Sequence, residues 1–155
     1  MFFMREAFLF GAMGMLRERV LELADKCAPQ HRTVQPPGFN NNILWHLGHI
    51  LTVTDGIMYG LSGEASQLPA SYRTFFGNGT KPSDWGDGVP SWETIIEQLK
   101  GQPQQIIAHF TGRLHQAAKE NFANAETAGE LLQVNLMHEH NHAGSINAML
   151  KVLNS

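Results

Sequence analysis

Two histidines near the carboxyl end, His138 and His142, lie four residues apart in the segment 133–151. On an α-helix with about 3.6 residues per turn, side chains at this spacing project from the same face, one turn above the other. Two imidazoles held in this way can chelate one divalent metal ion. The pair falls on the helical stripe that should face the core, where unpaired polar rings cost free energy. The spacing therefore predicts a metal site, with His140 on the opposite, solvated side.

The same segment permits three other interpretations. It spells H-E-x-x-H, the zincin protease pattern, in which Glu139 is the general base. The rest of that pattern is missing, because Ser145 stands where the extended form needs Gly and no β-rich lobe is predicted. Glu139-x-x-His142 also has the form used by di-iron carboxylate bundles, but the chain holds no second copy. Finally, two hydrogen-bonded core histidines without a metal would produce the same spacing.

Length and composition bound the class of protein. The 155 residues, 43% hydrophobic and 16% charged, fit one domain spanning residues 1–155 with a single core. The formal charge of −3, without runs of Lys or Arg, argues against nucleic acid or anionic lipid as a partner. No segment approaches the ~20 apolar residues of a membrane span. Arg5 and Glu6 interrupt the amino-terminal apolar run, and Cys27 is the only cysteine, so we expect a soluble cytoplasmic protein.

Hydrophobic periodicity and capping residues predict four helices, at about residues 2–27, 43–61, 92–114 and 128–153. Charged residues of the first helix, Arg17 among them, are expected on its outer faces. Asn42, Ser91 and Thr127 are the expected amino-terminal caps of the other three. Pro103 predicts a break or kink in the third helix. With one apolar stripe per helix and no alternating strand, the fold class is all-α, a four-helix bundle with a long loop between helices two and three.

The second helix offers a third metal ligand. His46 and His49 both lie on its inward side, about 60° apart at ~100° per residue, so helical geometry does not choose between them. His109 and His115 fall on the third helix and beyond it, where we expect surface or core roles.

The connection 62–90 is rich in glycine and proline and lacks periodicity, which is unusual for a loop of this length in a small domain and is often functional. Phe75, Phe76 and Trp85 show that it is more than a solvated linker. They predict either a lid over a pocket or a loop pinned to the helices, and we favour the pinned loop.

Two stretches resemble a known family. Pro-Pro-Gly-Phe-Asn-Asn-Asn-Ile-Leu-Trp-His46-Leu-Gly-His49-Ile resembles the helix-two signature of the DinB/YfiT-like metalloenzyme superfamily, and His138-x-x-x-His142-x-Gly-x-Ile resembles its helix-four signature. The resemblance implies a bundle of up-down-down-up type in which His49, His138 and His142 bind the metal, which decides against His46 as ligand. Ser145 departs from the Gln that many relatives carry, which affects hydrogen bonding around the site but leaves the three ligands intact.

Three neutral imidazoles leave a divalent ion, Zn or Ni in the first place, with an open coordination position and an uncompensated charge that favours an anion. Such an ion can lower the pKa of bound water to ~7 or bind a thiol as thiolate. Some members of the family that the chain resembles use the second chemistry with low-molecular-weight thiols as cosubstrates, while many others have no assigned reaction. We therefore expect a metal-dependent enzyme acting on a small-molecule substrate, thiol S-transferase-like or hydrolase-like, with Glu139 or His46 as the candidate catalytic group for proton transfer.

Two rival classes stay open at this point. One is a non-catalytic, stress-related protein whose helical bundle binds a metal or ligand without turnover. The other is a helical interaction module whose exposed apolar surface forms a homodimer.

Overall fold

The structure is a computed structural model that describes residues 5–155. Within this range the regular elements are all helical, apart from one isolated bridge between Ala117 and Thr127. The all-α fold class is therefore confirmed. The helices are α1 (Glu6–Asp25), α2 (Ile43–Asp55), α3 (Ser71–Phe76), α4 (Trp92–Phe110) and α5 (Ala128–Leu153).

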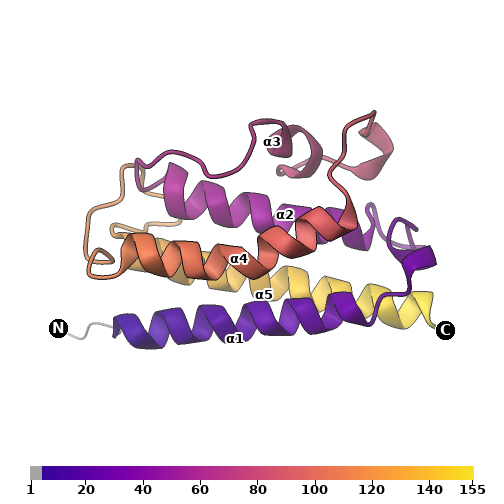
Figure 1. Ribbon diagram of the computed structural model, residues 1–155, viewed down its shortest axis with the longest axis horizontal. Coiled ribbons are helices and arrows are strands. Elements are labelled where there is room, and N and C mark those ends of the chain that lie inside the picture. The colour runs from indigo at the N-terminus through magenta and orange to yellow at the C-terminus, as the bar shows by residue number, and fades with distance from the viewer. Residues whose placement is uncertain (1–4) are drawn as a thin grey trace.

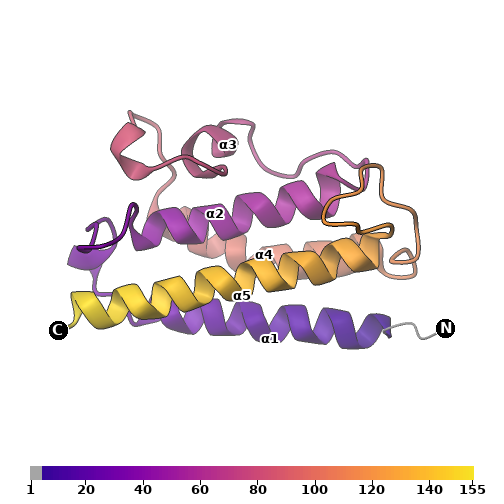
Figure 2. The ribbon, with the colours of Figure 1, turned by 180° about the vertical axis from the view of Figure 1, so that it is seen from behind.

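The four long helices lie side by side along the length of the molecule (Figure 1). In this view α1 and α5 run from left to right, whereas α2 and α4 run from right to left. Helix α1 packs against α4 and α5, and α2 packs against the same two helices from the other side. Seen from behind, α5 lies across the front, beside α1 and α2 (Figure 2). Among residues 5–155, no helix combines the length and hydropathy that crossing a lipid bilayer requires.

The three predicted amino-terminal caps are confirmed. The side-chain oxygen of Asn42 accepts from the backbone N–H of Trp45 at 2.8 Å, and Ser91 and Thr127 accept from the N–H three residues on. Each bond satisfies a donor that the first helical turn would otherwise leave unpaired. Helix α2 then continues as a π-helical turn, Gly56–Gly60, so the helical course ends close to the predicted residue 61.

Helix α4 runs through Pro103 to Phe110, so of the break or kink predicted at Pro103 the break is wrong, and the helix also ends short of residue 114. Proline has no N–H for the carbonyl of Leu99, four residues earlier. That carbonyl instead accepts from Nη1 of Arg17 on α1, at 2.8 Å. The missing helical bond is thus replaced from a neighbouring helix, and the backbone keeps its helical course.

The connection after α2 holds regular structure that the sequence did not predict, namely α3 and a 3-10 turn at Pro82–Asp84. Phe76, at the end of α3, is fully buried and packs against Gly48 of α2. Asp55 holds the start of the connection, because its carboxylate accepts from Ser66 Oγ at 2.6 Å and from the Gln67 N–H at 2.8 Å. These contacts favour the pinned loop over a lid.

Candidate metal centre

Three histidines from two helices, α2 and α5, converge on one place. His49 of α2 and His138 and His142 of α5 each offer one ring nitrogen, and these three atoms all lie within 4.8 Å of one another. His49 is buried, at 2% exposed, whereas His138 and His142 are partly exposed. The sequence prediction that these three residues come together agrees with the structure.

The ring of His49 is fixed on both sides. Its Nδ1 lies 2.6 Å from the carbonyl oxygen of Phe76, so Nδ1 carries the hydrogen and donates it. The remaining nitrogen, Nε2, therefore presents a lone pair, and it lies 3.1 Å from Nε2 of His138. The indole of Trp45 stacks on the His49 ring, with centroids 4.5 Å apart and planes 12° from parallel. The connection between α2 and α4 thus orients a candidate metal ligand through the main chain of Phe76.

His46 lies beside the cluster without belonging to it. The side chain is buried, and its Nδ1 is 2.9 Å from Nδ1 of His142. A hydrogen on Nδ1 of His142, directed at His46, leaves Nε2 of His142 as the nitrogen with a free lone pair. His46 is therefore placed to hold a ligand ring and to exchange a proton with it.

The environment keeps these rings neutral. Burial, together with the neighbouring His49, lowers the pKa of His46 and of His138 from the ordinary 6.5 to about 4. The same two causes, with His138 and His46 adding smaller effects, lower the pKa of His142 to about 3. Burial also lowers the pKa of His49, although the hydrogen bond to Phe76 acts in the opposite direction. Neutral imidazole is the form that binds metal ions.

Glu139, the candidate general base, lies in a buried ion pair. Arg17 donates from Nε to Oε1 at 2.7 Å and from Nη2 to Oε2 at 3.2 Å, and both side chains are almost completely buried. Nη2 also donates to Oε1 of Gln102 at 3.0 Å, and Gln102 donates to the carbonyl of Leu51 at 3.0 Å. This network joins α1, α2, α4 and α5 at one level of the molecule, next to His138.

The network corrects two expectations. Arg17 was expected on an outer face of the first helix, yet it is 2% exposed because the carboxylate of Glu139 and the carbonyl of Leu99 bind its guanidinium. The second expectation placed His138 and His142 on the stripe of α5 that faces the core. Glu139 lies at the centre of the buried face of α5 instead, and the two histidines stand at its edge, toward α2. The sequence held one signal that a donor such as Arg17 is buried against the third helix. A proline inside a helix, here Pro103, leaves a carbonyl without its helical donor, and that carbonyl needs another.

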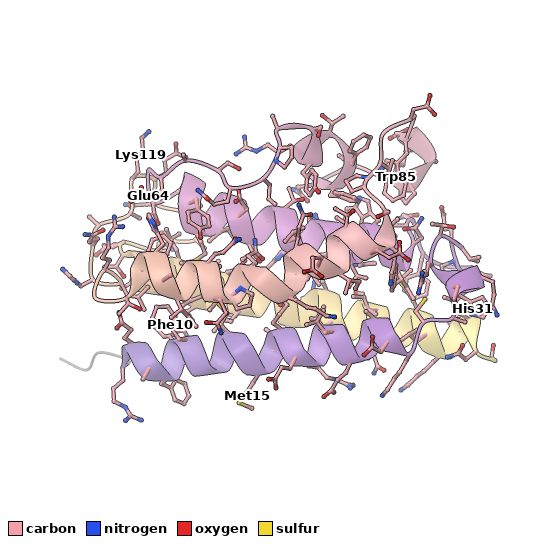
Figure 3. The ribbon with its side chains drawn as sticks, in the orientation of Figure 1. Phe10, Met15, His31, Glu64, Trp85 and Lys119 are labelled. Atoms are coloured by element: carbon pink, nitrogen blue, oxygen red, sulfur yellow. The ribbon has the colours of Figure 1, made fainter. Side chains whose placement is uncertain are left out.

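His109, His115 and His140 behave as expected. His140 and His115 are exposed. His109 lies 3.3 Å from the carboxylate of Glu64, which also binds Arg113 at 2.6 Å. Figure 3 labels Glu64 at the opposite end of the molecule from the loop that carries Trp85.

The donor set fits a metal ion. The group contains three neutral imidazoles and no carboxylate, which suits a borderline-soft divalent ion such as zinc. Nδ1 of His138 is buried without a hydrogen-bond partner among the described residues, while its Nε2 faces the lone pair of His49. Helices and site together define a protein that is helical over the described residues and carries three histidines that could hold one metal ion.

The comparisons with known proteins agree with this class. The model of a protein family, the DinB superfamily, matches residues 13–146, which include all three histidines. The chain therefore belongs to the DinB superfamily. The search of curated proteins finds no match.

Proposed function

We propose that this protein is a metal-dependent enzyme of thiol S-transferase or hydrolase type, with His49, His138 and His142 holding a divalent ion. The observation that carries the proposal is the convergence of three neutral ring nitrogens within 4.8 Å of one another. The up-down-down-up bundle expected for the family is supported by the helix directions in Figures 1 and 2.

The ion, when bound, supplies a Lewis acid that lowers the pKa of a thiol or a water molecule and attracts anions. The protein holds the histidines that would bind the ion in position. The carbonyl of Phe76 and the indole of Trp45 fix His49, and His46 fixes His142. Because His138 and His142 are partly exposed, a small molecule can approach from the α5 side. With no carboxylate in the cluster, the positive charge of the ion is not compensated by its ligands.

Of the two candidate catalytic groups, His46 has the stronger support. Its neutral ring contacts His142 at 2.9 Å, and it can therefore accept or deliver a proton at the edge of the site. Glu139 has less support as a general base. Both of its oxygens accept from Arg17 and the side chain is 0% exposed, so a substrate proton has no route to it without breaking the ion pair.

Activity screening tests the proposal. The zinc- and nickel-loaded protein is assayed against a panel of electrophiles with several low-molecular-weight thiols, and against ester and amide substrates. We expect thiol consumption or hydrolysis that needs the metal, disappears in His49→Ala, and persists in His109→Ala, which changes a histidine outside the site. Activity that survives in His49→Ala, or that is equal without metal, contradicts the proposal.

A non-catalytic metal- or ligand-binding protein is the alternative, and the burial of Glu139 favours it, since the one carboxylate next to the ligands is already neutralised by Arg17. This alternative predicts full metal binding with neither thiol consumption nor hydrolysis for any substrate in the panel.

A homodimer is the proposed assembly. Phe8 and Met15, seven residues apart on α1, are 55% and 74% exposed, and Figure 3 shows Met15 directed away from the other helices. Sedimentation velocity of the wild type and of Met15→Lys tests the dimer. A dimer that dissociates in the variant supports it, and a monomeric wild type contradicts it.

A further inference from the structure

A cavity of about 630 Å³, open to solvent, lies beside Trp45, the residue that stacks on His49, and none of the three histidines lines it. Its walls come from the link before α2 and from the loop after α3, and it is lined by Gln35, Asn40, Trp45, Gly79, Thr80, Lys81 and Ser83. This volume is in the range of small-molecule sites. Trp85 in Figure 3 marks the part of the loop that carries Lys81.

Trp45 joins this cavity to the metal centre. The indole is part of the cavity wall, and it also stacks on His49 at 4.5 Å and lies 6.2 Å from the ring of His142. The same indole therefore belongs both to the cavity wall and to the surroundings of His49 and His142. A molecule with one end at the metal and the other in the cavity would pass along this ring.

The wall is already formed. Nε1 of Trp45 donates to Oγ1 of Thr80 at 2.9 Å, and the single hydroxyl hydrogen of Thr80 is shared between the carbonyl oxygens of Gly77, at 2.7 Å, and Phe75, at 3.1 Å. Trp85 also donates to the carbonyl of Phe75, at 2.8 Å. The loop that carries Lys81 is thus tied to the helix that carries His49, and binding requires little ordering of the chain.

The residues that line the cavity favour a negatively charged ligand. Lys81 is the only charged residue among them, and the other polar side chains are amides and hydroxyls. Lys81 is exposed, and among residues 5–155 its ammonium forms no ion pair. An ammonium without a carboxylate partner, in a cavity with no other charged lining residue, favours an anion over a neutral or cationic ligand.

From these observations we propose that the cavity beside Trp45 is a subsite for the carboxylate end of a small polar substrate whose other end reaches the metal, and that Lys81 recognises this carboxylate. The inference rests on the proposed function for the reactive end of the substrate. The subsite itself is a property of the link, the loop and Trp45.

Nuclear magnetic resonance titrations of ¹⁵N-labelled protein test the subsite, with the indole N–H of Trp45 as reporter. The probes are succinate, its neutral analogue succinamide, inorganic phosphate, and mercaptosuccinate, each added to metal-free and to zinc-loaded protein. The variants are Lys81→Met, Lys81→Arg and, as a control with the same change in charge, Lys119→Met, which changes a residue beside Gly63 at the other end of α2.

We expect succinate to shift the Trp45 signal in metal-free protein and succinamide to shift it far less. An exposed ion pair contributes up to about 1 kcal/mol, which corresponds to about fivefold, so Lys81→Met should weaken succinate by about threefold to fivefold, while Lys81→Arg and Lys119→Met retain it. Mercaptosuccinate should bind zinc-loaded protein at least tenfold more tightly than succinate does, because its thiol reaches the metal. A stronger response to phosphate than to succinate would overturn the carboxylate assignment.

The two proposals fail separately. Equal binding of succinate and succinamide, or an unchanged affinity in Lys81→Met, overturns the subsite whatever the metal does. If zinc does not bind, or mercaptosuccinate gains nothing from zinc while the succinate response still depends on Lys81, the metal-dependent function fails and the subsite stands.

Discussion

Gly48→Ala tests the link between the loop and the metal centre. A Cβ at position 48 would lie 2.6 Å from Cγ of Phe76, and closer still to Cδ1 and Cε1 of the same ring. Carbon atoms in contact prefer a separation of about 3.5–4.0 Å, so the ring must retreat by roughly 1 Å or more. Phe76 is 0% exposed and its carbonyl holds His49 at 2.6 Å, so the movement reaches the metal ligand.

Two effects follow, and they are measured separately. Overpacking of this kind costs about 1–3 kcal/mol, and a loss of about 2 kcal/mol should lower the Tm of a domain of this size by roughly 4–8 °C. Disturbing the hydrogen-bond partner of a ligand histidine weakens metal binding by about tenfold or more. Circular dichroism gives the Tm, and competition with a chromophoric chelator gives the zinc Kd.

Two further variants make the test specific. Gly11→Ala on α1, where an added Cβ meets no described atom within 4 Å, should keep both Tm and zinc Kd or raise the Tm slightly. In Gly48→Ala combined with Phe76→Leu, the smaller side chain relieves the clash while the main-chain carbonyl remains, so zinc affinity should recover. If Gly48→Ala alone keeps the wild-type Tm and zinc Kd, the reasoning from Phe76 to His49 is refuted.

Two further predictions concern the buried charges and the histidines. Arg17→Met leaves Glu139 charged and unpaired in the interior and should cost about 3–5 kcal/mol of unfolding free energy in urea, whereas a loss below about 1 kcal/mol would show that the ion pair does not hold the helices. The second prediction is a pH dependence of the metal-free protein. Because the folded-state pKa values of His46, His138 and His142 are about 4, 4 and 3 against an ordinary 6.5, the unfolded chain binds more protons below pH 6.5. Stability should therefore fall as pH drops from about 6.5 to about 4, with a smaller fall in His46→Ala, and a Tm that is constant over this window would contradict the assigned protonation states.

Most of the fold could be predicted from local patterns in the sequence. The caps at Asn42, Ser91 and Thr127 and the helical spacing of apolar residues depend on neighbours within a few positions, and the structure agrees with both. The pairing of His138 with His142 is likewise a property of one helix. Choosing His49 over His46 required the family resemblance, because helical geometry left both possible and the deciding contact with Phe76 comes from another segment.

The features that the sequence did not predict depend on distant partners. From the sequence alone, Arg17 is predicted on the surface of α1, because its partner Glu139 lies more than a hundred positions away. The continuity of α4 through Pro103 depends on the same Arg17. Helix α3 is only six residues long and is held by burial of Phe76, a tertiary effect that overrides its weak periodicity.

The central claim is that three histidines from α2 and α5 share one ion. Its most direct measurement is the cobalt content and visible absorption spectrum of the protein after loading with Co²⁺, compared between the wild type, the combined His49→Ala, His138→Ala and His142→Ala variant, and His109→Ala. We predict one ion per chain with ligand-field bands in the wild type and in His109→Ala, and loss of both in the triple variant. The same content and spectrum in the triple variant would contradict the account.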